Sequence, residues 1–249
     1  MSTPNVPASD APTEIVFRSD MKVELVRGHA SDADVLFAAR VSTKGEQSLA
    51  DVDADPQKSA GLINYLMRDR HGSPYEHNSM TFYVEAPILV FREFMRHRIA
   101  SYNEESGRYR QLRPVFYVPG PERRLVQEGK PGAYTFVEGT PEQHELVVRE
   151  TKEACNRAYE AYLTMLDAGV AREVARGVLP VATYSSMYVT MNARSLMNFL
   201  SLRTKDDDAH FPSFPQREIE MVAEQMEAEW ARLMPLTHAA FQANGRVAP

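Results

Sequence analysis

Residues 80–109, MTFYVEAPILVFREFMRHRIASYNEESGRY, change from one hydrophobic period to another. Apolar and polar residues alternate from Met80 to Glu85, which predicts a strand with one buried face. Pro87 suits the first turn of a helix whose apolar stripe continues to about Arg98. The Ser, Asn and Gly residues beyond it predict irregular backbone that a ligand can approach closely. A strand, a helix and a loop in this order indicate a fold that mixes α and β structure.

The rest of the chain places strands early and helices late. The other predicted strands are 21–26 and 114–118, and the other predicted helices begin after Ser31 and after Pro56 and continue at 140–169, about 171–177, 193–203 and 215–235. The Pro- and Gly-rich segment 119–139 is predicted to be a loop. This order predicts an α+β fold, with a mainly antiparallel β-sheet flanked by helices and a helical C-terminal half. Residues 1–14 are expected to form a disordered tail and 15–249 a single domain.

Composition and charge exclude several classes of protein. The chain is 43% apolar and 25% charged, which is typical of a folded globular protein. Its net charge of −6 disfavours non-specific binding to nucleic acid. Of the 28 basic residues 22 are arginine, whose planar guanidinium binds phosphates and carboxylates in pairs of hydrogen bonds. GC-rich codon usage gives the same bias.

The lone Cys155 excludes an internal disulfide. It lies on the apolar stripe of the predicted helix 140–169, which places it in the core. No run of 18 apolar residues occurs, and the N-terminus lacks the apolar core of a signal peptide. We therefore expect a cytoplasmic protein without a membrane-spanning segment.

Basic residues gather at the end of the predicted helix that begins at Pro87. Arg92 and Arg96 lie four residues apart on one face, with His97 and Arg98 beside them. These cations repel each other unless an anion is present, so the cluster predicts a site for a phosphorylated ligand. The alternative is a solvated basic helix whose charges pair with neighbouring glutamates.

At this cluster the sequence resembles a known family. Residues 96–109, RHRIASYNEESGRY, resemble the signature of the flavin-dependent thymidylate synthases, R-H-R-x-x-S-x-N-E-x-S-x-R-Y, and match it at nine fixed positions. Residues 71–77 resemble the family's upstream segment H-x-S-P-x-E-H, and 192–203 resemble its downstream block. The resemblance covers roughly residues 20–230.

The resemblance implies an activity and a set of ligands. The family converts dUMP to dTMP, taking a methylene carbon from methylenetetrahydrofolate and a hydride from FAD that NADPH has reduced. It implies FAD-binding positions at Ser73, Arg96, His97, Arg98, Glu104, Asn192, Arg194 and Asn198. It implies dUMP-binding positions at Glu93, Arg96, Glu104, Ser106, Gly107, Arg108, Arg176 and Arg203. It also implies a homotetramer whose sites take residues from more than one subunit.

One arginine has a catalytic role by resemblance. Uracil is a poor carbon nucleophile until negative charge builds on its ring, and a cation at its N3–O4 edge would stabilise that charge. The family assigns this role to the arginine that matches Arg203. A cysteine nucleophile must be exposed and close to a cation, and Cys155 meets neither condition. We expect Ser106 to orient dUMP, because a serine nucleophile needs a nearby base.

The sequence departs from the family pattern in two places. Position 93 is Glu where many members have Gln, which puts a charge near the nucleotide unless Arg92 or Arg96 neutralises it. The connection 204–214 after Arg203 is longer than a tight turn. The three aspartates 206–208 within it are interpreted as a solvated loop, and no metal site is expected there.

Three other interpretations stay open. His71, Glu76 and His77 could bind a metal, although their spacing is not that of a zinc protease helix, and by resemblance His71 and Glu76 would instead lie near the flavin. Tyr102, Tyr109 and Tyr117 between arginines could stack on single-stranded nucleic acid. A degenerate family member could bind flavin without turnover.

Overall fold

The central feature of the chain is a four-stranded sheet of order β2-β3-β8-β4. The computed structural model describes residues 14–45, 56–130 and 133–249. The strands of this sheet are β2 (Lys22–His29), β3 (Ser79–Pro87), β8 (Tyr184–Met191) and β4 (Ser101–Glu104). The pairs β2–β3 and β4–β8 are antiparallel, and a bulge interrupts β2 between Leu25 and Arg27.

The described chain divides into two compact units that interleave along the sequence. The first unit holds residues 14–20, Ala86–Phe91, 105–130 and 133–185, and the second holds 21–45, 56–85, Arg92–Glu104 and Ser186–Pro249. Each unit is described below by itself.

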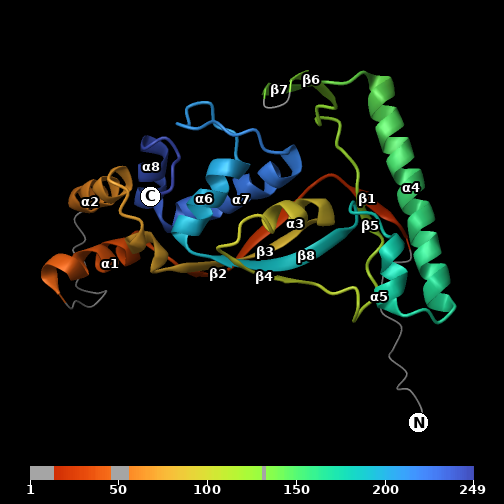
Figure 1. Ribbon diagram of the computed structural model, residues 1–249, viewed down its shortest axis with the longest axis horizontal. Helices are drawn as coiled ribbons and strands as arrows, with labels where there is room; N and C mark the ends of the chain where they lie inside the picture. The colour runs from red at the N-terminus through yellow and green to blue at the C-terminus, as the bar shows by residue number, and fades with distance from the viewer. Residues whose placement is uncertain (1–13, 46–55, 131–132) are drawn as a thin grey trace, which may run out of the picture. The chain divides into compact units, whose positions relative to one another are not determined.

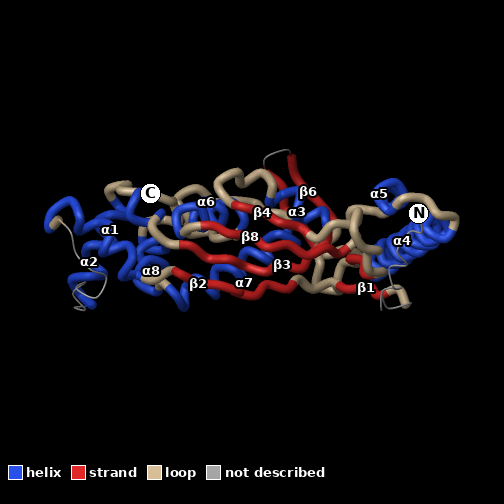
Figure 2. The backbone as a smooth tube through the Cα atoms, turned by 90° about the horizontal axis from the view of Figure 1, so that it is seen from below, coloured by secondary structure: helices blue, strands red, loops and turns tan. Residues whose placement is uncertain are grey.

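The second unit contains six helices among the residues that the structure describes, and two of them cover one face of the sheet. The six are α1 (Asp32–Lys44), α2 (Pro56–Arg68), η2 (Ser73–Glu76), α6 (Ala193–Arg203), α7 (Arg217–Leu233) and α8 (Pro235–Ala243). Figures 1 and 2 show α6 and α7 on the same face of β2, β3 and β8. Between them lie side chains that are fully buried, among them Phe82 and Val84 of β3, Leu196 and Phe199 of α6, and Trp230 of α7. The alternation that predicted β3 therefore buries one face of that strand.

The first unit is built around one long helix. Its elements are β1 (Val16–Arg18), β5 (Val115–Tyr117), β6 (Val126–Lys130), β7 (Ala133–Val137), α4 (Pro141–Asp167), α5 (Arg172–Ala175) and η3 (Arg176–Val178). The pair β1–β5 is parallel and β6–β7 is a hairpin. Thr140 and Gln143 form a capping box at the start of α4, as the sequence predicts. A core cluster joins α4 to β5 and α5, and its members are Phe116, Cys155, Tyr159, Tyr162 and Ala175.

The α+β fold class and the antiparallel character of the main sheet are confirmed. Helix 193–203 has the predicted bounds, and the helix predicted at 215–235 is α7. Three local predictions are wrong. Helix α3 (Ile88–Phe94) ends before Arg98, residues 101–104 form strand β4 rather than a loop, and segment 119–139 contains the hairpin β6–β7. The domain bounds stay a prediction, and the expected tail 1–14 lies outside the described residues except for Glu14.

Candidate active site

The guanidinium of Arg203 is the centre of a polar cluster in the second unit. Asn192 begins α6 by accepting a hydrogen bond from the Ser195 backbone N–H, and Arg203 lies in the last turn, where a cation is favoured by the helix dipole. Its Nη1 donates to Glu93 Oε2 at 2.7 Å, and its Nε donates to His97 Nε2 at 3.0 Å. The side chains of both Arg203 and Glu93 are mostly shielded from solvent. The cluster therefore orients the arginine that the resemblance makes catalytic.

His97 is half-buried and held by contacts to its ring and its backbone. Its ring packs edge-on against Phe199, with centroids 4.9 Å apart. Its backbone carbonyl and that of Phe94 both accept hydrogen bonds from the Tyr102 hydroxyl, at 2.7 and 3.0 Å. Burial, and then the charge of Arg203, lower the pKa of His97 to about 4. The imidazole is consequently neutral at physiological pH.

Glu93 pairs with Arg203, which is not one of the two neighbouring arginines, Arg92 and Arg96, that the sequence suggests as partners. Burial raises the pKa of Glu93, the Arg203 charge opposes that rise, and Glu218 adds to it. Its Oε1 is buried and makes no hydrogen bond within the described part of the chain. A buried carboxylate oxygen without a partner is costly, and a ligand donor would relieve that cost.

Of the predicted cations, Arg92 lies on α3, whereas Arg96 and Arg98 follow its end. Helix α3 ends at Phe94, whose carbonyl accepts hydrogen bonds from the His97 N–H and from the Tyr102 hydroxyl. Arg96 and Arg98 are exposed just beyond this end, and among residues 14–45, 56–130 and 133–249 neither makes an ion pair. Glu104 lies at the end of β4, opposite Met187 of β8. The predicted helical arrangement of the arginines is therefore wrong, although the second unit does contain all of these side chains.

A second group of predicted residues surrounds the start of α6. Arg194 donates from Nη1 to Glu76 and from Nε to the Pro249 carbonyl, at 2.5 and 2.6 Å. A Cβ at Gly72 would lie 2.6 Å from Arg194 Cζ, so only glycine fits there. Asn198 donates to the Arg194 carbonyl at 3.1 Å. Ser73, at the start of η2, is exposed.

The remaining predicted residues lie together in the first unit. Gly107 is buried against the side chain of Arg176, which a Cβ at this position would approach to 3.2 Å. Arg108 donates from its backbone N–H to Ser106 Oγ at 3.2 Å, and its Nε donates to Glu173 at 2.8 Å. The structure thus brings Ser106, Gly107, Arg108 and Arg176 close together.

The interpretation of His71, Glu76 and His77 as a metal site gains no support. Glu76 is paired with Arg194, and His71 stacks on Tyr65. No group of three His, Cys, Asp or Glu side chains suited to a metal occurs in the described ranges. Within the same ranges, no helix has the length and apolar character needed to span a membrane.

The donor set fits a flavin dinucleotide. The diphosphate and the reduced ring are anionic, and they need cations and amide donors. Within the described residues, the guanidinium groups of Arg96 and Arg98 pair with no carboxylate, so both are available to an anionic ligand. The side chains of His97 and Arg203 are polar and are held in place by hydrogen bonds. Asn192 and Asn198 add amides on one helix, α6.

A cavity of about 400 Å³ in the second unit lies apart from this set. Its lining comprises Met67, Arg68, Arg70, His210, Phe211, Asn244 and Val247. None of the predicted site residues lines it. The 204–214 connection, which departs from the family pattern, contributes two of these side chains.

Comparisons with known proteins match nearly the whole chain. The family described as thymidylate synthase complementing protein matches residues 24–236. The flavin-dependent thymidylate synthase of Streptomyces coelicolor is 70% identical over 98% of this chain and 99% of its own length. That of Tropheryma whipplei is 60% identical over 94% of this chain and 97% of its own. The solved UMP/dUMP methylase PolB from Streptomyces cacaoi, bound with 5-Br dUMP, has a TM-score of 0.89 at 59% identity, covering 94% of this chain and 100% of that chain. The chain therefore belongs to the thymidylate synthase complementing protein family, whose members include these flavin-dependent thymidylate synthases.

Proposed function

We propose that the protein is a flavin-dependent thymidylate synthase, which methylates dUMP to dTMP reductively with methylenetetrahydrofolate as carbon donor. The observation that carries the proposal is 70% identity over nearly the full length to an enzyme of that name. The structure adds a physical reason. The chain holds a shielded guanidinium, that of Arg203, in a fixed orientation at the end of a helix.

Arg203 has the central chemical role in this proposal. Negative charge must build on the uracil ring before its C5 can attack an electrophilic carbon. A guanidinium held by Glu93 and His97 needs little reorganisation to stabilise that charge, which is the condition for strong electrostatic catalysis. Because His97 is neutral, it does not compete with Arg203 for the anionic ring.

Other residues bind and orient the ligands. By resemblance, Ser106, Gly107, Arg108 and Arg176 hold the phosphate and sugar of dUMP, and close approach at Gly107 suits a phosphate oxygen. Arg96, Arg98, Arg194, Asn192 and Asn198 would hold FAD. The bound flavin, reduced by NADPH, supplies the hydride. No cysteine nucleophile takes part, because Cys155 is buried in the core of the first unit.

The test is NADPH oxidation by the purified FAD-loaded protein, with and without dUMP, together with detection of dTMP when methylenetetrahydrofolate is added. Stimulation by dUMP and formation of dTMP are expected. Oxidation that is indifferent to dUMP would indicate a general flavin reductase. Absence of oxidation would favour a binding protein or a degenerate homologue.

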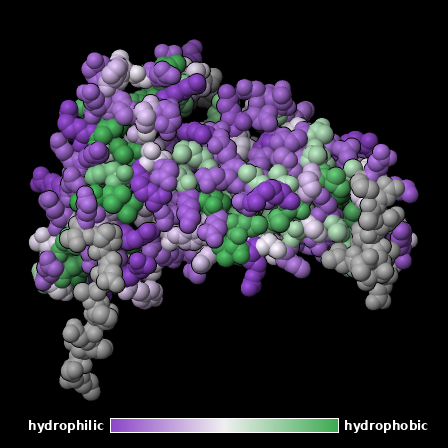
Figure 3. Space-filling model, turned by 180° about the vertical axis from the view of Figure 1, so that it is seen from behind, coloured by the Kyte–Doolittle hydropathy of each residue, from purple (hydrophilic) through white to green (hydrophobic). Residues whose placement is uncertain are grey.

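We also propose a cytoplasmic homotetramer, as the family resemblance implies. Tyr83 and Tyr188 support it, because they contact each other on one face of the main sheet and Tyr188 is 49% exposed. Exposed aromatic side chains are typical of interfaces. Figure 3 shows further hydrophobic side chains at the surface of the face it displays. Light scattering should give a tetramer for the wild type and a smaller species for Tyr188→Glu.

A further inference from the structure

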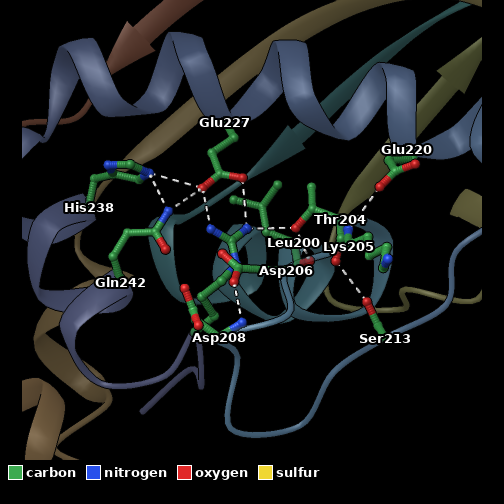
Figure 4. A network of polar contacts seen from close by, with 11 residues as sticks. Leu200, Thr204, Lys205, Asp206, Asp208, Ser213, Glu220, Glu227, His238 and Gln242 are labelled. Carbon is green, nitrogen blue, oxygen red and sulfur yellow. Dashed lines mark hydrogen bonds and ion pairs between the residues drawn. The ribbon is translucent and has the colours of Figure 1, made fainter.

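A buried arginine near the end of the chain holds the residue that follows Arg203. Arg246 is 5% exposed, and its Nη2 donates to Thr204 Oγ1 at 2.6 Å. The Thr204 hydroxyl in turn donates to the Leu200 carbonyl at 2.8 Å, in the last turn of α6. Arg246 is thus linked through one hydroxyl to the helix end that carries Arg203. Figure 4 shows Thr204 beside Leu200 at this place.

Glu227 on α7 fixes Arg246 in turn. It accepts from Arg246 Nη1 and Nη2 at 2.7 and 2.8 Å, and its Oε1 also contacts His238 Nε2 at 2.9 Å. Burial alone would raise the pKa of Glu227, but hydrogen bonds from His238 and Arg246 outweigh it and lower the pKa to about 2. Glu227 therefore stays ionised, and the guanidinium of Arg246 keeps its bidentate hydrogen bonds to the carboxylate.

The backbone at Thr204 is anchored by two further contacts. The Ser213 hydroxyl donates to the Thr204 carbonyl at 2.7 Å, and the Lys205 N–H donates to Glu220 of α7 at 2.9 Å. Figure 4 shows these side chains converging on the start of the 204–214 connection. Ser213 and Glu220 thus fix the backbone of Thr204 and Lys205, immediately after Arg203.

The backbone of Arg246 adopts an unfavourable conformation, which indicates that the contacts of its side chain compensate for the cost. Its φ is 57°, in the left-handed region that an arginine adopts only at a cost in free energy. The neighbouring Gly245 has φ 69°, and a Cβ there would lie 2.9 Å from His210 Cβ. A buried ion pair is weak evidence for stability, and its better attested use is to fix a unique arrangement.

We propose that Arg246 and Thr204 are positioning residues for Arg203. By clamping the end of α6 they fix the direction from which the guanidinium reaches its ligand. This inference rests on the proposed function of Arg203. In this proposal neither Arg246 nor Thr204 contacts the substrate.

The experiment compares Thr204→Val and Arg246→Lys with two matched controls. Thr164→Val removes a hydroxyl that makes the same bond to a helix carbonyl four residues back, on α4. Arg232→Lys changes an exposed arginine of α7 that pairs with Glu229. For each FAD-loaded enzyme, the flavin content, the NADPH oxidation without dUMP, and kcat and KM for dUMP are measured.

The two test variants should lose on the order of 10- to 100-fold in kcat, the scale of a misplacement of about 1 Å, with flavin content and dUMP-free oxidation unchanged. The controls should stay within about twofold of the wild type. In an Arg203→Lys background, Thr204→Val should have little further effect, because both changes act through one group.

Additive losses in that background would overturn the inference, and so would parallel loss of flavin and dUMP-free oxidation. If the wild type forms dTMP and the effects add, only this inference fails. If the wild type forms no dTMP, the proposed function fails, and this inference fails with it.

Discussion

Arg203 Nε donates a hydrogen bond to His97 Nε2 at 3.0 Å. A guanidinium cannot accept, so the imidazole must be unprotonated at Nε2 and carry its proton on Nδ1. Protonation of His97 would place two cations in contact within a shielded cluster. The pair therefore makes the cluster sensitive to acid.

We expect His97 to titrate with a pKa of about 4 in the wild type, because burial and the Arg203 charge both disfavour its cation. In Arg203→Ala the charge is lost and burial remains, so the pKa should rise toward 6.5. NMR titration of the imidazole nitrogens measures both values, and His97→Gln assigns the resonance. A wild-type value near 6.5 would contradict the assignment.

The same pKa predicts how stability depends on pH. Between about pH 4 and 6.5 the unfolded chain binds a proton at His97 that the folded chain does not. The contribution of this residue to the free energy of unfolding should therefore fall as the pH drops through that window. Denaturant titrations of the wild type and of His97→Gln at pH 7 and pH 5 should diverge in this direction.

Arg203→Ala should lose roughly 100- to 1000-fold in turnover of dUMP, the usual effect of removing a charge-stabilising donor. FAD should still bind, which flavin absorbance after gel filtration reports. The variant also leaves Glu93 buried without its cation, so Glu93→Gln in the same chain should recover part of the lost thermal stability. Arg149→Ala, which breaks an exposed pair on α4, is the control. Near-normal turnover in Arg203→Ala would refute the assignment.

Glu93→Gln should strengthen dUMP binding by a few fold, up to about 10-fold. The ionised carboxylate competes with the nucleotide for the guanidinium of Arg203, and a neutral amide competes less. Calorimetric titration of the FAD-loaded protein measures the affinity. Asp69→Asn, which neutralises an exposed partner of Arg68, should leave it unchanged. Weaker binding by Glu93→Gln would show that the carboxylate itself contacts the nucleotide.

Ser106→Ala should bind dUMP more weakly and still turn over at saturating dUMP. Ser106 Oγ accepts a hydrogen bond from the Arg108 backbone N–H at 3.2 Å, so the hydroxyl shapes the turn that presents Gly107 and Arg108. The measurement is kcat and KM for dUMP. Complete loss of turnover with intact binding would instead make Ser106 a nucleophile.

Cys155→Ala should retain the turnover of the wild type and lose roughly 1–2 kcal/mol of stability, as is usual for a small truncation in a core. The thiol is 2% exposed and burial raises its pKa, so the thiolate is scarce. Thermal denaturation and dTMP formation check both parts. Inactivation of the native wild type by a thiol reagent would contradict them.

The sequence predicted best those elements whose signals are local. The capping box at Thr140 and the apolar stripe containing Cys155 gave α4, and the bounds of α6 followed from its apolar period. Strand β8 was missed although its signal is local: Met187, Val189 and Met191 are buried and alternate with the more exposed Ser186, Tyr188 and Thr190. The hairpin β6–β7 was missed because the Gly and Pro residues of this segment gave a stronger signal for a loop than its short strands gave for β structure.

The residues of the candidate site were predicted by motif, but their partners were not. The pairs Arg203–Glu93 and Arg246–Thr204 are separated by 110 and 42 residues. No period or cap signals a contact over such separations. The contact at the end of α3 is of the same kind, because the Tyr102 hydroxyl that donates to the Phe94 carbonyl comes from the next strand.

The interleaving of the two compact units has a consequence for synthesis of the protein. The chain passes from one unit to the other five times, and the second unit includes the last 64 residues, Ser186–Pro249. Strand β8 and helix α6 cannot form until those residues have left the ribosome. Until then β2 and β3 lack the strand and the helix that pack against them in the folded unit. Folding of this unit cannot be completed before those residues are synthesised, and the high sequence separation of its contacts favours slow folding. Truncation from the C-terminal end would remove the sheet's partners rather than a detachable domain.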